Sequence, residues 1–226
     1  MKQRRRGLQT KWAYIVNSLQ EIIPSYEQAS SLISLHADRR MRPEAVSFAV
    51  SPGALVLDLG AGPGTMSSFV VRAGGEPVLL DASRLMLRAS DFPNRVQATF
   101  ENMPFRDGVF DGAVSGFALR DAYDLKKALA QLSRVLKVGG RFSLCDLGKP
   151  DSAVGTILLG AYMRIVPNVV GLISVGRSGL RYGSLFDTFV LTPHNGELVS
   201  LLSRFFREVH IHATQLGGSI VVKCVR

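Results

Sequence analysis

The residues with the clearest chemical potential form a short acidic and glycine-rich segment, residues 58–64 (DLGAGPG). It follows a continuous apolar run, residues 54–58 (ALVLD), which predicts a buried parallel strand, and precedes residues 65–72, which can start a helix. Glycines at such a junction let the backbone turn sharply and approach a ligand closely. A second acid, Asp81, ends the next apolar run, residues 77–81 (PVLLD). In a doubly wound sheet this pattern predicts a nucleotide-like ligand outside the strand ends, with the acid at its ribose.

The glycine spacing separates two classes of nucleotide-like ligand. A dinucleotide site needs G-x-G-x-x-G/A, in which the third small residue packs the helix on the strand. Here the glycines are Gly60, Gly62 and Gly64, and Thr65 follows them. The carboxylate of Asp58 would repel a pyrophosphate, whereas S-adenosylmethionine carries an ammonium and a sulfonium and no phosphate. We therefore expect S-adenosylmethionine as the cofactor, with a dinucleotide, or a tight turn without a ligand, as the alternatives.

The elements that position this loop follow from the hydrophobic pattern. Residues 12–50 have a helical pattern, and one of their helices is expected to start after Pro43. Beyond residue 54 strands alternate with helices. The expected strands are residues 54–58, 77–81, 95–99, 110–116, 141–147, 207–213 and 218–224, and the expected helices are residues 65–72, 124–136 (closed by Gly139 and Gly140) and 194–204.

These elements predict a single α/β domain over residues 1–226. We expect a doubly wound, mostly parallel seven-stranded sheet of Rossmann-like topology with helices on both faces. An antiparallel hairpin turning at Gly217 and Gly218 would form its C-terminal edge. Within this domain we expect a basic arm at residues 1–11, a helical cap at residues 12–50, and a core at residues 51–226 with an apolar lid at about residues 153–182.

The composition excludes several classes of protein. With 226 residues, 46% of them hydrophobic, 20% charged and only two cysteines, the chain is neither disordered, nor collagen-like, nor a disulfide scaffold. A reducing compartment, the cytoplasm, is therefore expected. The most apolar stretch, residues 153–176, contains Arg164, Pro167 and Asn168, and we expect these three residues to interrupt it, so that no membrane-spanning segment forms.

The basic residues and the histidines indicate possible partners, but less specifically than the glycine loop indicates a cofactor. The chain has 27 basic and 18 acidic residues and a net charge of +9, and five of the basic residues lie in the first twelve: Lys2, Arg4, Arg5, Arg6 and Lys11. Such an arm is attracted to an anionic lipid surface or to nucleic acid, or is simply solvated. His210 and His212 would share one face of a strand, but two ligands do not make a metal site, so no metal is expected.

Further segments match a known pattern. They are Tyr26-Glu27, Ser34-Leu35, Arg39-Arg40, residues 101–105 (ENMPF), 117–121 (FALRD), 134–141 (RVLKVGGR) and 148–150 (GKP), together with Tyr162, Pro167, Tyr182 and Pro193. On these residues the chain resembles the class I S-adenosylmethionine-dependent methyltransferases and, more narrowly, the ubiquinone/menaquinone biosynthesis C-methyltransferase family. The resemblance runs from about residue 20 to the C-terminus.

The resemblance implies which residues would bind the cofactor. They are Asp58, Gly60, Ala61, Gly62, Pro63, Gly64, Asp81, Thr99, Phe100, Ser115 and Gly116. Asp81 would accept hydrogen bonds from the ribose hydroxyls. Thr99 and Phe100 replace the family's Asp-Ala or Asn-Ala at the adenine, where Thr can still accept a hydrogen bond and Phe can pack on the purine. The family has Ser where this chain has Gly116, with Ser115 one place earlier.

The resemblance also implies catalytic residues. Arg120 matches the family's motif arginine, for which proton acceptance through water is one role. Because an arginine stays protonated, we favour stabilisation of a phenolate. Asp121 replaces the usual Asn and would be the base, and Tyr26 would orient the substrate hydroxyl. The structural alternatives are a local ion pair between Arg120 and Asp121, and a helix anchor at Tyr26.

The implied substrate is a hydrophobic small molecule, a prenylated quinol precursor methylated on a ring carbon. Residues 157–173, with Tyr162 and Met163, would cover the strand ends as a lid, or would only pack on the core. The alternatives are a methyltransferase acting on another small molecule or lipid, and an RNA-binding or non-catalytic methyltransferase-like protein. Attachment to an anionic membrane through the basic arm is an expectation, a homodimer is left open, and nucleic acid is the less favoured partner.

Overall fold

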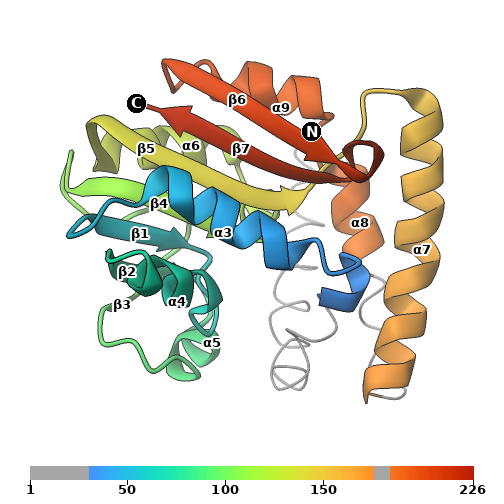
Figure 1. Cartoon of the computed structure of the whole chain (residues 1–226), viewed down its shortest axis with the longest axis horizontal. Helices are drawn as coiled ribbons and strands as arrows, with labels where there is room; N and C mark the ends of the chain where they lie inside the picture. Colours follow the sequence, from blue (N-terminus) through green and yellow to red (C-terminus); the bar gives the residue numbers. More distant parts are fainter. Residues whose placement is uncertain (1–30, 176–183) are drawn as a thin grey trace.

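The computed structural model describes residues 31–175 and 184–226, which form one seven-stranded sheet with helices on both of its faces (Figure 1). The strands are β1 (Leu55–Leu59), β2 (Glu76–Asp81), β3 (Arg95–Gln97), β4 (Phe110–Gly116), β5 (Leu136–Leu147), β6 (Glu208–Thr214) and β7 (Ser219–Val225). The helices are α3 (Asp38–Ala49), α4 (Thr65–Arg72), α5 (Arg84–Arg88), α6 (Leu125–Val135), α7 (Ala153–Val175), α8 (Ser184–Leu191) and α9 (Asn195–Leu202), with short 3-10 turns η1 (Leu119–Asp121) and η3 (Gln215–Gly217).

The sheet has the strand order β3-β2-β1-β4-β5-β7-β6. Strands β1 to β5 pair in parallel, and β7 is antiparallel to both β5 and β6. The expected mostly parallel sheet with an antiparallel C-terminal hairpin is therefore confirmed. The chain order reverses between β1 and β4, and in doubly wound sheets ligands bind outside the carboxyl ends of the strands at that point.

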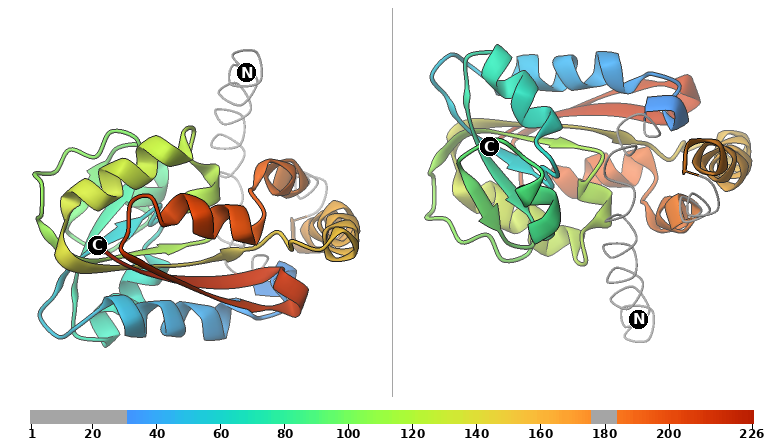
Figure 2. Two further views of the ribbon diagram at one scale, coloured as in Figure 1. Left: turned by 90° about the horizontal axis from the view of Figure 1, so that it is seen from above. Right: turned by 90° about the horizontal axis from the view of Figure 1, so that it is seen from below.

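Helices lie on both faces of the sheet (Figure 2), and a hydrophobic cluster packs each layer of helices against it. Because successive side chains of a strand point to opposite faces, β1 contributes to both layers. Leu57 and Leu59 pack in the larger cluster with residues of α6 and α9, and Val56 packs in the other cluster with residues of α3 and α4. Asp58, two residues after Val56, therefore points to the face covered by α3 and α4.

Two helix boundaries differ from the sequence prediction. Helix α3 begins at Asp38, so Pro43 lies inside the helix and not before it. The expected closure of α6 at Gly139 and Gly140 is wrong, because α6 ends at Val135 and both glycines belong to β5. Strand pairing outweighs the glycine signal here. Leu136 already pairs with β4, and Gly139 takes up the irregularity in the register with a φ of +76°.

The apolar stretch, which Arg164, Pro167 and Asn168 interrupt in sequence, forms a single helix. Helix α7 is continuous from Ala153 to Val175 and contains Pro167, and the side chain of Asn168 donates a hydrogen bond back to the carbonyl of Arg164 at 2.8 Å. Within the described residues, Ala153–Ile173 has a mean hydropathy of 1.6 and is long and apolar enough to cross a membrane by length and composition. Figure 1 shows α7 beyond the carboxyl ends of the parallel strands, with α8 beside it.

The close contact of α3 with the sheet yields a stability prediction. A Cβ added at Gly112 in β4 would lie 2.2 Å from the carbonyl oxygen of Ala49, so the end of α3 and β4 would have to separate. We expect Gly112→Ala to lower the free energy of unfolding by about 1–3 kcal/mol. The matched control is Gly160→Ala in α7, whose Cβ meets only Phe189 at 3.6 Å, and which we expect to raise stability by up to about 1 kcal/mol.

Urea denaturation followed by circular dichroism measures both changes. Equal midpoints for Gly112→Ala and the unmodified protein would contradict the close seating of α3 on β4.

Candidate active site

The turn after β1 is fixed to the neighbouring strand by its backbone. The N–H groups of Gly60 and Ala61 both donate to the carbonyl of Leu80 in β2, at 2.8 and 3.1 Å. Gly60, Gly62 and Gly64 have φ values of +68°, +55° and +95°, which glycine adopts without strain. The glycine loop therefore has one defined position above the carboxyl ends of β1 and β2.

Asp81 lies directly against this loop. One of its carboxylate oxygens accepts the N–H of Gly62 at 2.9 Å, and the other accepts the N–H of Ser83 at 2.7 Å. Burial raises the pKa of Asp81, and the two N–H groups oppose that rise by stabilising the charged form. Each oxygen retains lone pairs for further donors, so the side chain is oriented to receive hydroxyl groups.

Asp58 is a fully buried carboxylate beneath the loop. The hydroxyl of Ser67 in α4 donates to its Oδ2 at 2.7 Å, and its Oδ1 has no hydrogen-bond partner. Burial raises the pKa of Asp58 to about 6, and the Ser67 hydrogen bonds and the nearby charge of Arg42 limit the rise. Neither Ser67 nor Arg42 was among the predicted site residues. The available sequence signal for Ser67 was its position in the apolar first turns of α4, where a polar side chain needs a partner.

The remaining loop residues pack against their surroundings. Ala61 is buried with Leu79 and Leu87, and Pro63 is half-buried. A Cβ on Gly60 would lie 3.1 Å from the ring of Phe100. Phe100 therefore lies against the glycine loop.

The residue before Phe100, Thr99, is half-buried and its carbonyl accepts the N–H of Asn102 at 3.2 Å.

Two predicted site residues at the end of β4, Ser115 and Gly116, have different contacts. The hydroxyl of Ser115 is buried and donates to the carbonyl of Leu59 at 3.0 Å, so it holds β4 to β1. Gly116 leaves space for its neighbours, because a Cβ there would lie 2.7 Å from Met66 and 2.9 Å from Nη1 of Arg42.

Arg120 forms a buried ion pair with Asp146 at the end of β5. The local pair with Asp121, held open above, is not among the salt bridges of the described residues. Sequence reasoning missed Asp146, although it follows the pattern of Asp81, an acid at the end of a predicted strand. Asp146 lies 26 residues after Arg120, so the sequence does not indicate that the two side chains pair.

Asp121 is a second carboxylate, besides Asp146, that interacts with the charge of Arg120. Burial raises its pKa to about 6, the charge of Arg120 opposes the rise, and the carboxylates of Asp146 and Asp81 add to it. Asp121 therefore lies within electrostatic range of both Asp81, at the end of β2, and Asp146, at the end of β5. A half-buried carboxylate with a pKa near neutrality can accept a proton from a phenol-like group.

Other segments of the predicted pattern hold the scaffold. Glu101 is buried and accepts the backbone N–H of Asp124, just before α6. Arg134 donates to the carbonyls of Met103 and Phe105. Tyr26 and the basic arm lie outside the described residues, so their roles stay predictions. The hydroxyl of Tyr162 in α7 donates to the carbonyl of Ile33 at 2.9 Å, which ties α7 to the segment before α3.

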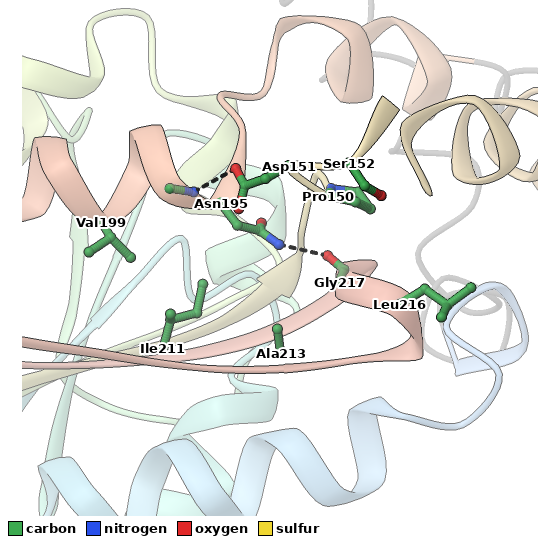
Figure 3. A pocket seen from close by; sticks show the side chains of 10 residues that line it. Pro150, Asp151, Ser152, Asn195, Val199, Ile211, Ala213, Leu216 and Gly217 are labelled. Carbon is green, nitrogen blue, oxygen red and sulfur yellow. Dashed lines mark hydrogen bonds between the residues drawn. The ribbon is translucent and has the colours of Figure 1, made fainter. Parts of the chain in front are cut away.

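A pocket of about 480 Å³ lies between α9 and the β6–β7 hairpin and contains none of the predicted site residues (Figure 3). Its walls are joined by Asn195, which donates to the carbonyl of Gly217 at 2.9 Å, and by Asp151, which accepts the N–H of Gly196 at 3.0 Å. These contacts use the polar groups of the pocket for bracing, and we assign it no chemistry.

Histidines and cysteines are found at separate places in the part of the chain that the structure describes. It holds no group of three or more His, Cys, Asp or Glu side chains arranged for a metal ion. His212 contacts Glu44 at 3.0 Å. Cys145 and Cys224 are free and buried, and burial raises the pKa of each thiol to about 12.

Comparison with known proteins finds similar methyltransferases. A family described as a methyltransferase domain matches residues 57–144. A demethylmenaquinone methyltransferase of Clavibacter sepedonicus is 31% identical over 79% of this chain and 76% of its own length. A ubiquinone/menaquinone biosynthesis C-methyltransferase UbiE of Syntrophotalea carbinolica is 32% identical over 88% of each chain.

Solved structures support the fold. A structure from Thermotoga maritima, described as an S-adenosylmethionine-dependent methyltransferase and possible histamine N-methyltransferase, has a TM-score of 0.63 and 18% identity over 93% of this chain and 99% of its own. With the sheet order, the glycine loop and the acid after β2, these findings lead to one conclusion. The chain belongs to the ubiquinone/menaquinone biosynthesis C-methyltransferase family and is a class I S-adenosylmethionine-dependent methyltransferase.

Proposed function

We propose that this enzyme methylates a ring carbon of a hydrophobic, prenylated quinol precursor. The observation that carries the proposal is the combination of Asp121, a carboxylate of raised pKa, with the buried guanidinium of Arg120 at the strand ends. The relatives with 31% and 32% identity, whose names refer to demethylmenaquinone and to ubiquinone/menaquinone biosynthesis, support a substrate of that class.

The residues around the glycine loop fit the cofactor. Asp81 offers an oriented carboxylate to a pair of ribose hydroxyls, and the buried charge of Asp58 favours a cationic ligand over a phosphate. When bound, S-adenosylmethionine would supply a methyl group attached to a sulfonium sulfur, and the sulfur leaves as part of a neutral thioether.

The reaction requires one proton acceptor and one anion stabiliser. Loss of the phenolic proton delivers negative charge to the neighbouring ring carbon. That carbon bonds to the methyl group as the carbon–sulfur bond breaks, and its own proton then leaves while the phenolate oxygen regains one, for a net release of one proton. The protein has to align the ring, accept the phenolic proton and stabilise the phenolate.

Two residues divide these tasks. Asp121 accepts the phenolic proton, directly or through water, because its pKa of about 6 leaves it ionised yet basic near neutral pH. Arg120 stays protonated and is held by Asp146, so it acts as a fixed positive charge beside the phenolate. Tyr26 keeps its proposed role of orienting the substrate hydroxyl.

A lipid-soluble substrate calls for access to a bilayer, and α7 supplies a surface for it. The exposed apolar residues of this helix are Val154, Ile157, Leu158, Ile165, Val169, Leu172 and Ile173. At 100° per residue these side chains fall within one broad face of the helix, whereas Met163 and Pro167 are buried on the other side. The helix contains no acid and has only Arg164 as a charged residue.

Because α7 packs against α8 and is joined through Tyr162 to Ile33, contact with the membrane surface is favoured over crossing of the bilayer. We therefore include peripheral attachment of a cytoplasmic enzyme in the proposal, with the basic arm adding attraction to anionic lipid.

The cofactor site is tested first by Asp81→Asn. Loss of a charged acceptor for the ribose hydroxyls should weaken binding of S-adenosylhomocysteine about 10- to 100-fold, equivalent to about 1.5–3 kcal/mol. Isothermal titration measures the affinity, and Asp91→Asn, an exposed acid, is the matched control with no expected change. Unchanged affinity in Asp81→Asn would remove this residue from the cofactor site.

The proton acceptor is tested by the pH dependence of transfer to a demethylmenaquinol. With Asp121 as base, kcat/KM should rise with pH through about 6, because the carboxylate must be ionised to accept the proton. In Asp121→Ala the rate should fall by about 10²–10⁴ and this rise should disappear. A variant that keeps both the rate and the rise would assign the proton to another group. Methyl transfer to an amine, a thiol or a lipid, with none to the quinol, would overturn the substrate proposal.

Attachment through α7 is tested with vesicles containing anionic lipid. Ile165→Glu places a charge in the apolar stripe and should lower the bound fraction several-fold. Val138→Glu makes the same change at an 89% exposed valine of β5, near its amino end, and should leave binding unchanged. If both variants bind like the unmodified protein in sedimentation assays, α7 does not contact the membrane.

A further inference from the structure

A buried arginine lies at the carboxyl end of β4, and the catalytic proposal does not use it. Arg42, on α3, is 9% exposed. Its guanidinium lies 5.1 Å from the centre of the Phe117 ring, at the carboxyl end of β4. Its Nε has no hydrogen-bond partner within the described residues. A buried polar group without a partner costs free energy, so its retention points to a ligand that completes it.

A second incomplete group lies on the same face of the sheet. Asp58 points toward α3 and α4, its Oδ1 also lacks a partner, and the charge of Arg42 acts on its pKa. Removing a buried cation from water is costly unless an anion pairs with it, yet the two groups are not joined by a hydrogen bond. A positive and a negative group, both partly unpaired, thus lie near each other at the end of β1.

This pair is complementary to an α-amino acid, which carries a carboxylate and an ammonium on one carbon. The methyl donor of this enzyme class ends in such a group. We propose that Arg42 binds the carboxylate of the methionine end of S-adenosylmethionine, beside Asp58, which attracts its ammonium. A guanidinium can bind a carboxylate through two parallel hydrogen bonds, and this geometry selects a carboxylate over a neutral group.

Gly116 provides independent support from packing. A Cβ at this position would lie 2.9 Å from Nη1 of Arg42 and 2.7 Å from Met66. Any larger residue there would displace the guanidinium from its place at the end of β4. Glycine at position 116, where the resemblance predicts serine, is therefore the residue that the position of Arg42 requires.

The test compares two ligands that differ by one carboxylate, S-adenosylmethionine and decarboxylated S-adenosylmethionine, by isothermal titration. Arg42→Met removes the charge at similar length and should weaken S-adenosylmethionine at least about tenfold, or about 1.4 kcal/mol. It should change the affinity for the decarboxylated ligand less than twofold. Arg42→Lys should recover part of the loss, and Arg40→Met, an exposed arginine of the same helix, should change neither affinity.

The other possible outcomes contradict the proposed role of Arg42. Equal losses for both ligands would make Arg42 a packing residue, and no loss for either would remove it from the site. If Arg42→Met does not fold, Arg42→Gln, which keeps a polar side chain without the charge, gives the same comparison, and it should weaken only the carboxylate-bearing ligand. The assay contains no methyl acceptor, so failure of the quinol proposal would leave this inference standing.

Discussion

Two backbone hydrogen bonds from the glycine loop to the carbonyl of Leu80 determine where everything else in the site can lie. They tie the turn after β1 to the end of β2, and left-handed φ angles at Gly60, Gly62 and Gly64 make such a turn accessible. The next N–H along the loop orients Asp81. The geometry of this loop is thus set by its backbone, and side chains such as Asp81 are added at its edge.

The charges of the site lie on both faces of the sheet. Arg42 and Asp58 occupy the α3 and α4 side, whereas Arg120 and Asp146 join η1 to the end of β5. The two arginines differ in how they are compensated. Arg120 has an ion-pair partner, Asp146, supplied by the fold, whereas Arg42 forms no salt bridge or hydrogen bond among the described residues. Fixed charge suits an anion that forms during the reaction, and unpartnered donors suit a ligand that binds and leaves.

Helix α7 shows how one element serves two environments. Its inner side packs with α8, and the hydroxyl of Tyr162 binds the carbonyl of Ile33, while its outer side carries an apolar stripe that the described residues leave exposed. Pro167 does not break the helix, and Asn168 satisfies the carbonyl of Arg164 with its side chain. A sequence pattern that reads as an interrupted span is therefore a continuous one-sided helix.

The sequence alone determined the glycine loop, the acid after β2, the bounds of α4 and β4, and the antiparallel edge, because these depend on local backbone preference and on hydrophobic period. The tertiary structure decided which charges meet. Arg42 is 16 residues before Asp58, and Arg120 is 26 residues before Asp146, and each pair is brought together only when strands and helices pack. It also placed Gly139 in a strand and not at a helix end, because pairing with β4 outweighs a local stop signal.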